Sequence, residues 1–467
     1  MTNSRPNLLL LLTDEQRWDQ IGLVNPIVKT PNLDGLAEDG VLFERGYTTN
    51  PSCVPSRAAM MTGKYPSQCG SPTYVTYLPN YEHTFMSMLH DAGYHTAVVG
   101  KQHFGDTEID RGYDYEEIVD SHFAPADLGA VAQRNTWFDY LEAEGIKGID
   151  DLVDTLFAHV QRWKADVKYH VDSFVGRRAL RWLQEDRPDD QPWFFCASFP
   201  GPHSPIDGIG LPHEALYKNT DLDSPHTTAA DLQGRPSHQL IAHGTTEPGE
   251  LNDGQYRQAR LGYYANISLI DEQIGRLINC LKTEGLYDNT LIIMVSDHGT
   301  YLGEFGKLGK SQCLSEVLMR IPMIIKPPAG GATGKRESSF TNLVDVAATL
   351  LSAADVPIPE SFAGRDLSKY LQSEDDLNDR EQIYMEAGGL RGLRAGDWKI
   401  THYQDREYGE LYNLAEDPWE KENLWDIPEH HGRRDAMRIA ILDEVVRISP
   451  RNSTSWNDST VPPAPAI

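Results

Sequence analysis

Cysteine is scarce in this chain, which has five in 467 residues. An odd and sparse set is not the disulfide framework of a small secreted domain. No two of them form a Cys-x-x-Cys pair, so a cysteine-based zinc site is not expected. The five are Cys53, Cys69, Cys196, Cys280 and Cys313.

Positive charge is also in deficit, with 42 lysine and arginine residues against 69 aspartate and glutamate residues and a formal net charge of -27. Such a chain is not expected to bind nucleic acid or an anionic membrane surface. It would repel an anionic substrate at long range, so any anion site must be locally basic. We attribute the acidic excess itself to solubility.

Long hydrophobic runs are missing as well. The apolar run at residues 8–12 is too short to span a membrane, and no small-residue cleavage site follows it. We interpret the run as a buried first strand. We expect a cytoplasmic protein, unless a leader was removed to give a periplasmic or secreted one.

Strand-like and helix-like segments alternate through most of the chain. This alternation predicts an α/β fold with a mostly parallel central sheet flanked by helices. Strands are predicted at 7–13, 41–47, 95–99, 193–199, 290–295 and 321–326, and helices at 31–39, 84–92, 255–285 and 342–353.

The pattern of predicted elements changes near residue 370, from alternating strands and helices to short strands followed by one helix. We place a domain boundary there, between a catalytic domain (1–370) and a smaller C-terminal α+β domain (371–467). In the first domain we expect an insertion at about 105–190, with helices around 150–185, and a long loop at about 205–250. In the second we expect strands at 383–386, 390–394, 399–402 and 411–412, a helix near 433–448 and an extended tail at 453–467.

Polar side chains follow several of the predicted strands directly. In a parallel sheet, ligands collect at the carboxyl ends of the strands. We therefore expect one composite active site there. The polar pairs are Asp14-Glu15, Gly100-Lys101, Pro202-His203 and Asp297-His298.

The first and last of these pairs are candidate metal ligands. Carboxylate oxygens with few nitrogens favour a hard divalent ion such as Ca2+, Mg2+ or Mn2+ over zinc. Asp14 alone would more often cap a helix, and Asp297 alone would more often lie in a turn. Acidic residues at two equivalent strand ends favour the metal.

Cys53 precedes a helix predicted at 56–61, so it faces the unpaired N–H groups and the positive end of the helix dipole. Arg57 adds a fixed positive charge. A lone cysteine is more often a buried structural residue, and a plain thiol is a poor partner for a hard ion. An oxygen nucleophile at this position would suit both the ion and an anionic substrate.

Four further basic residues are candidates for anion binding and proton transfer. Each alone is more often a surface residue or a satisfied loop histidine. Together they offer charge for a bound anion and an acid that can protonate a leaving oxygen. They are Lys101, His103, His203 and Lys310.

These stretches resemble, in order, the motifs of the type I sulfatases, and the resemblance extends over nearly the whole chain. It implies an alkaline-phosphatase-like fold and hydrolysis of a sulfate monoester, whether a sulfated carbohydrate, an aryl sulfate or another small organosulfate. The motifs are Asp14, 53–63, 100–105, 202–205, 296–322 and 409–424.

By this resemblance, a maturation enzyme oxidises Cys53 to formylglycine, whose hydrate attacks sulfur and holds the sulfate as a covalent ester. Asp14, Asp297 and His298 bind a metal ion together with residue 53. Calcium is the usual ion, with Mn2+ or Mg2+ as alternatives. Glu15 is a weaker candidate ligand, because many relatives have a second aspartate there.

The resemblance also assigns roles to the basic residues. Arg57 and Lys101 steady the hydrate, and Lys310 binds sulfate. His203 helps to protonate the leaving alcohol. His103 removes a proton from the remaining hydroxyl of the hydrate, so that sulfate is expelled and the aldehyde forms again.

One departure bears on the substrate. His298 stands where many members have asparagine, as it does in choline-sulfatase-like and phosphonate monoester hydrolase-like relatives. A phosphonate monoester or phosphodiester hydrolase on the same scaffold therefore remains the alternative. A non-catalytic sulfoglycan-binding protein is a more distant one. The sequence leaves the oligomeric state open, and a homo-oligomer is one of the states that it allows.

Overall fold

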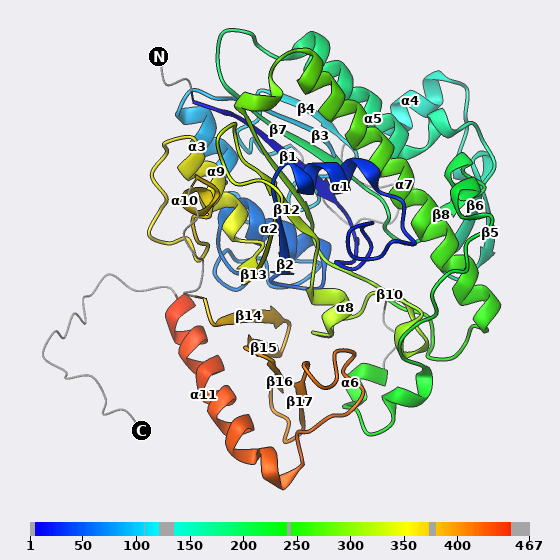
Figure 1. The fold of residues 1–467 in the computed structure, drawn as a ribbon, viewed down its shortest axis with the longest axis vertical. Coiled ribbons are helices and arrows are strands. Elements are labelled where there is room, and N and C mark those ends of the chain that lie inside the picture. Colours follow the sequence, from blue (N-terminus) through cyan, green and yellow to red (C-terminus); the bar gives the residue numbers. More distant parts are fainter. Residues whose placement is uncertain (1–4, 107, 121–134, 241–243, 373–379, 450–467) are drawn as a thin grey trace, which may run out of the picture.

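The computed structural model describes residues 5–449 except 107, 121–134, 241–243 and 373–379. Figure 1 shows a large sheet with helices on both faces, and a second, smaller sheet beside one edge of it. The large sheet has eight strands in the order β13-β2-β12-β9-β1-β7-β3-β4. The predicted tail at 453–467 lies outside the described residues.

The elements are bounded as follows. The strands are β1 Asn7–Thr13, β2 Val41–Tyr47, β3 His95–Gly100, β4 Tyr115–Ile118, β5 Val153–Phe157, β6 Val160–Trp163, β7 Trp193–Phe199, β8 Ile206–Ile209, β9 Thr290–Ser296, β10 Tyr301–Leu302, β11 Leu308–Gly309, β12 Met323–Lys326, β13 Lys335–Asn342, β14 Gln382–Ala387, β15 Leu390–Ala395, β16 Trp398–Tyr403 and β17 Gly409–Asn413. The helices are α1 Pro31–Glu38, α2 Cys53–Thr62, α3 Phe85–Asp91, α4 Thr136–Ala143, α5 Val171–Arg181, α6 Ser237–Leu240, α7 Asp253–Thr283, α8 Glu316–Met319, α9 Asp345–Ala353, α10 Ser368–Gln372 and α11 His431–Ile448.

β1 shows why its apolar run forms the centre of the sheet. All seven of its residues are buried, and successive side chains point to opposite faces. Leu9 and Leu11 pack into the core beneath α1, α5 and α7, whereas Leu8, Leu10 and Leu12 pack beneath α2, α3 and α9. A strand covered on both faces needs such a continuous run.

The predicted α/β architecture is confirmed, with one strand reversed. β12 is antiparallel to both of its neighbours, β2 and β9. The other neighbouring pairs in the large sheet are parallel. The carboxyl ends of β1, β3, β7 and β9 therefore lie at the same edge.

Two predictions for the connecting segments are wrong in part. Residues 153–163, expected to be helical, form the hairpin β5–β6, which β8 extends into a three-stranded sheet. This pairing with a distant strand overrides the weak local pattern. The expected loop at 205–250 contains β8 and α6 as well as short 3-10 turns at Pro212–Tyr217 and Ala229–Leu232.

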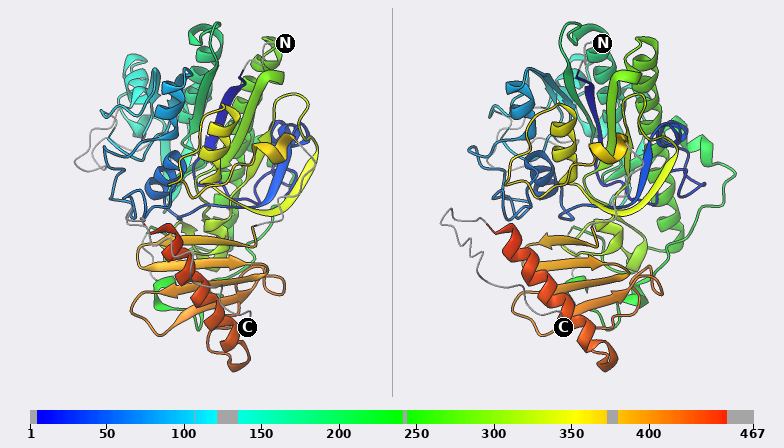
Figure 2. Two further views of the ribbon diagram at one scale, coloured as in Figure 1. Left: turned by 90° about the vertical axis from the view of Figure 1, so that its left-hand side faces the viewer. Right: turned by 60° about the vertical axis from the view of Figure 1, so that its left-hand side comes forward.

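The C-terminal strands predicted from the sequence form the smaller sheet. β14, β15, β16 and β17 are antiparallel neighbours in that order. α11 lies along this sheet (Figure 2) and packs on it through Met437, Ile441 and Ile448. A domain boundary at residue 370 stays a prediction. No helix in the described part of the chain is long and apolar enough to cross a membrane.

Candidate active site

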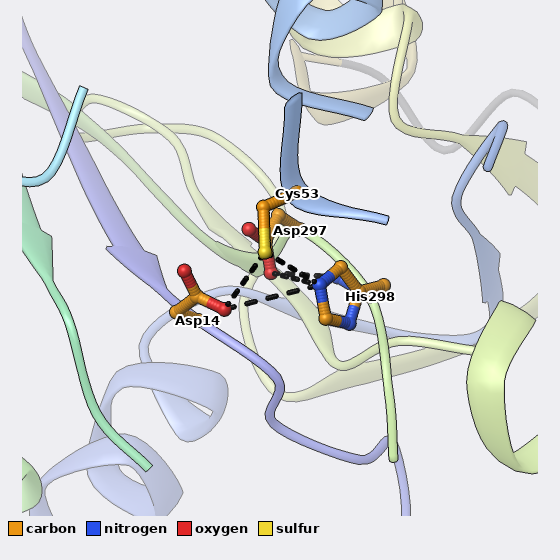
Figure 3. A group of neighbouring side chains, drawn as sticks. All are labelled: Asp14, Cys53, Asp297 and His298. Carbon is orange, nitrogen blue, oxygen red and sulfur yellow. Dashed lines mark hydrogen bonds and ion pairs between the residues drawn. The ribbon is translucent and has the colours of Figure 1, made fainter. Parts of the chain in front are cut away.

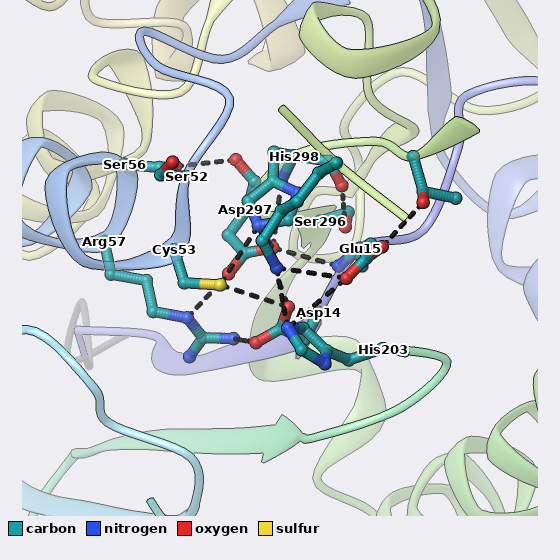
Figure 4. Close-up of polar contacts among 12 residues, drawn as sticks. Asp14, Glu15, Ser52, Cys53, Ser56, Arg57, His203, Ser296, Asp297 and His298 are labelled. Carbon is teal, nitrogen blue, oxygen red and sulfur yellow. Dashed lines mark hydrogen bonds and ion pairs between the residues drawn. The ribbon is translucent and has the colours of Figure 1, made fainter. Parts of the chain in front are cut away.

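The predicted polar pairs meet at the carboxyl edge of the large sheet. Thr13, the last residue of β1, pairs with Phe199 of β7 and with Ser296 of β9. Gly100, at the end of β3, pairs with Ser198 of β7. The loops that follow these strands therefore begin at one level, and their side chains converge (Figure 4).

Asp14, Asp297 and His298 from these loops, together with Cys53 from the start of α2, form what we call the inner cluster. None of the four is exposed to solvent. Cys53 Sγ lies 3.1 Å from His298 Nε2 and 3.6 Å from Asp14 Oδ1. His298 Nε2 lies 3.8 Å from Asp14 Oδ1 and 3.7 Å from Asp297 Oδ1 (Figure 3).

α2 presents Cys53 to this cluster. The helix begins at Cys53 itself, three residues earlier than the predicted start, because Pro55 fits the first turn, where no backbone N–H is needed. Ser56 Oγ donates a 2.6 Å hydrogen bond to the carbonyl of Asp297. This bond ties the start of α2 to the end of β9.

Arg57 and Lys101 flank the inner cluster and neutralise its carboxylates. Arg57 Nε donates to Asp297 Oδ2 over 2.7 Å, and its Nη2 lies 3.3 Å from Asp14 Oδ2. Lys101 forms an ion pair with the same Asp14 oxygen. Burial would raise the pKa of Asp14, but Lys101, His203 and Arg57 outweigh it and hold the pKa well below its usual range.

The inner cluster fits a hard divalent cation. Arg57 and Lys101 contact the Oδ2 atoms, whereas the Oδ1 atoms of both aspartates lie near His298 Nε2. Asp297 Oδ1 also accepts the N–H groups of Glu15 and His298, over 3.1 and 2.9 Å. Ligands about 2.4 Å from an ion and at right angles lie about 3.4 Å apart, close to the spacings observed here. His298 Nδ1 is bonded to Gly299 O over 2.8 Å, so Nε2 faces the other ligand atoms.

The protonation of His298 agrees with a cation in this place. Burial would lower its pKa, but Asp297 and Cys53 raise it to about 9. The groups around the ring therefore favour a positive charge there, and without an ion the ring carries a proton at neutral pH. A cation bound among them would displace that proton.

Glu15, His203 and Lys310 form a second group, the outer cluster. Glu15 Oε2 lies 3.0 Å from Lys310 Nζ and 3.3 Å from His203 Nε2, and the two nitrogens are 2.6 Å apart. The side chains of His203 and Lys310 are 15% and 16% exposed, so this cluster opens to solvent. Burial would lower the pKa of Lys310, but Cys53 and Glu15 raise it well above its usual range.

The structure separates Glu15 from the other predicted metal ligands. It has a φ of +68°, in the left-handed region, and its Oε2 atom contacts His203 and Lys310 rather than Cys53 or His298. Thr300 Oγ1 donates to its other carboxylate oxygen over 2.6 Å. Asp14, Glu15 and His203 also lie within ligand distance of one another, so Glu15 could join a cation only from this side.

His103 lies beside Lys101 and is 3% exposed. Neither ring nitrogen has a hydrogen-bond partner in the described part of the chain. Burial and Lys101 lower its pKa well below the usual value, so the ring is neutral at pH 7 and can accept a proton. The ring of Tyr74, which sequence reasoning missed, lies edge-on at 5.7 Å.

Three other residues of the site were missed. Ser198 accepts a 3.0 Å hydrogen bond from Arg57 Nη1, Thr300 binds Glu15, and Asp120 accepts hydrogen bonds from the turn after β3. Ser198 and Asp120 lie at the ends of β7 and β4, so the same strand-end rule could have found them. No sequence signal marked Tyr74.

Comparisons with known proteins identify the family of the chain. The family model described as sulfatase matches residues 6–356, and that of the N-sulphoglucosamine sulphohydrolase C-terminal region matches 303–444. An arylsulfatase of Clostridium perfringens is 28% identical over 462 residues, 94% of each chain. A choline-sulfatase of Rhizobium meliloti is 28% identical over 454 residues, 92% of this chain and 84% of the relative.

The fold is similar to that of the solved phosphonate monoester hydrolase of Agrobacterium radiobacter, with a TM-score of 0.82, 22% identity and coverage of 95% of this chain and 96% of that one. At this identity the likeness shows the fold alone. The sulfatase match covers well over half of the chain. The chain therefore belongs to the type I sulfatase family of the alkaline-phosphatase-like superfamily and is a sulfuric ester hydrolase.

Proposed function

We propose that the protein hydrolyses sulfate monoesters of small organic molecules or oligosaccharides, with formylglycine made from Cys53 as its nucleophile. The observation that carries the proposal is the convergence of Cys53 with two carboxylates and an imidazole. Sulfur suits a hard ion poorly, whereas an oxygen of the aldehyde hydrate would match the other ligands. The hydrate supplies one hydroxyl to attack sulfur and a second from which the aldehyde can form again.

The inner cluster would hold the metal through Asp14, Asp297, His298 and residue 53. We expect Ca2+, with Mn2+ or Mg2+ as alternatives, since oxygen ligands dominate. Such an ion polarises the bound ester and offsets the repulsion between the carboxylates. Arg57 and Lys101 hold the aspartates and the nucleophile in place.

The remaining side chains would divide the work of binding and proton transfer. Lys310, charged and partly exposed, binds the sulfate. His203, next to it at the open side, protonates the leaving alcohol. His103 is neutral and unpaired in the described structure, which suits a base that accepts a proton when sulfate leaves.

Burial of Cys53 bears on how the nucleophile is made. The residue is 0% exposed, so a maturation enzyme could not reach it in the folded protein. We propose that a formylglycine-generating enzyme acts on the chain before it folds.

We also propose that the protein is cytoplasmic, which cell fractionation would test. We propose in addition that it forms a homo-oligomer, which light scattering would test.

Two measurements test the main proposal. The mass of the peptide that contains residue 53 should show the aldehyde, and an unmodified cysteine in fully active protein would contradict the mechanism. A panel of aryl sulfate, phosphonate monoester and phosphodiester substrates should give the highest kcat/KM on the sulfate. The second candidate function is hydrolysis of phosphonate monoesters or phosphodiesters, because phosphonate monoester hydrolase-like relatives also have histidine at the position of His298. A higher kcat/KM on these phosphorus esters would make this second function the correct one.

A further inference from the structure

The turn after β3 carries two of the proposed catalytic side chains, Lys101 and His103, and its first half is firmly held. Lys101 N–H donates to Ser198 O over 2.9 Å, and Lys101 O accepts a 2.8 Å hydrogen bond from Arg57. Gly100 has a φ of +110°, and a Cβ there would lie 1.9 Å from Ser198 O, so only glycine fits. β7 and α2 therefore fix the start of the turn.

The carboxylate of Asp120 holds the second half through two backbone amides. The N–H groups of Gln102 and His103 both donate to Asp120 Oδ1, over 2.7 and 2.9 Å. Asp120 follows β4, the edge strand beside β3, and is 2% exposed. Its Oδ2 atom has no hydrogen-bond partner among the described residues. Burial raises the pKa of Asp120 to about 6, so this carboxylate is costly to keep where it is.

His103 depends on such support. Its φ of +50° lies in the left-handed region, which a residue with a side chain occupies only when its surroundings hold it there. No hydrogen bond within the described structure fixes the two ring nitrogens. The position of the imidazole is therefore set mainly by its backbone, and the backbone N–H is held by Asp120.

We propose that Asp120 is a positioning residue of the active site, which acts through the turn that carries Lys101 and His103. The inference rests on the function proposed above for those two side chains. What matters is the Oδ1 acceptor rather than the negative charge. If both amides lose it, the turn relaxes and the imidazole moves, and a displacement of about 1 Å at a reacting group can cost about 10²-fold in rate.

Hydrogen–deuterium exchange tests the positioning independently of any activity. In Asp120→Ala the amides of the peptide at 100–105 should exchange faster, whereas in Asp120→Asn, whose amide oxygen can accept the same bonds, they should exchange as in the wild type. Unchanged exchange in Asp120→Ala would overturn the proposal.

Asp271→Ala is the matched control. Asp271 is also 2% exposed, accepts the N–H groups of Asn32 and Leu33 at the start of α1, and has its pKa raised by burial to about 6. It lies outside the active site. This variant should lose stability as Asp120→Ala does, yet leave exchange at 100–105 and kcat unchanged.

Turnover then shows whether the position of the turn matters to the chemistry. We expect Asp120→Ala to lose about 10²-fold in kcat with little change in KM, and Asp120→Asn to keep most of its activity. If the alanine variant does not fold, Asp120→Glu replaces it. Glutamate keeps the charge but is one methylene longer, so it should be less active than asparagine.

Two outcomes separate this inference from the proposed function. An active Asp120→Glu beside an inactive Asp120→Asn would mean that the charge matters and would overturn the inference. If exchange at 100–105 responds as expected but the wild-type protein hydrolyses neither sulfate nor phosphorus esters, the proposed function fails and the positioning role stands.

Discussion

The inner and outer clusters differ in exposure and in what holds them, although both begin at adjacent residues, Asp14 and Glu15. The inner cluster is fully buried, and Arg57 and Lys101 fix its carboxylates from outside. The outer cluster opens to solvent, and its cation, Lys310, is also the group expected to meet the substrate. The inner cluster is therefore complete before substrate arrives, whereas the outer cluster must exchange internal contacts for substrate contacts.

The nucleophile should give the largest effect. Cys53→Ala removes the reacting atom from the inner cluster, and turnover of an aryl sulfate should fall by about 10⁴-fold or more. Cys280→Ala, a buried cysteine of α7 outside the site, is the control and should keep full turnover. Full turnover in Cys53→Ala would remove the inner cluster from the chemistry altogether.

The proton donor of the outer cluster should come next. His203→Gln keeps a side chain of similar size but loses the acid, so kcat on an alkyl or sugar sulfate should fall by about 10³-fold. Aryl sulfates with acidic phenols need less protonation and should lose less. Measuring kcat across a series of leaving groups tests this, and an equal loss across the series would make His203 a structural residue.

Lys310 should show a smaller effect, and one expressed in binding. Lys310→Met removes the charge that faces the substrate and leaves Glu15 without its cation, so kcat/KM should fall by about 10²-fold, with a raised KM. Lys310→Arg keeps the charge and should recover part of the loss. If KM stays the same in Lys310→Met, the outer cluster does not bind the sulfate.

The sequence predicted where the site residues lie, but it did not predict that they separate into an inner and an outer cluster. The sequence analysis placed Asp14, Lys101, His203 and Asp297 at one edge of the sheet, because the carboxyl ends of parallel strands all lie at the same edge. Glu15 has a positive φ and pairs with Lys310 and His203, and no local pattern in the sequence predicted either feature.

Long-range contacts account for the other surprises. The hairpin β5–β6 depends on pairing with β8, in which Val160 of β6 pairs with Ile206, 46 residues further along the chain. The role inferred for Asp120 depends on backbone donors from the neighbouring turn. Neither can be predicted from a segment of sequence taken alone.

Metal removal tests whether the two clusters are separate. A chelator should lower the melting temperature of the wild type, since an ion at about 100 times its dissociation constant stabilises by about 2.7 kcal/mol. Asp297→Asn should abolish the calcium-dependent shift, which calorimetry can measure without substrate. Glu15→Gln should keep it. If Glu15→Gln also abolishes the shift, the two clusters form one metal site and the division drawn above is wrong.

The pH dependence of calcium binding sharpens the same comparison. In the protein with an unmodified Cys53 and no ion, the pKa of His298 is about 9. Only the neutral ring can be a ligand, so calcium binding to this form should release one proton at neutral pH. Affinity should therefore rise with pH, by about tenfold per unit, up to pH 9 and level off above it. Titration calorimetry in buffers of different ionisation enthalpy counts the released proton. His298→Asn, which has no such proton, should bind calcium with little dependence on pH in this range. A steep rise that persists in His298→Asn would mean that another group, outside the inner cluster, controls the metal.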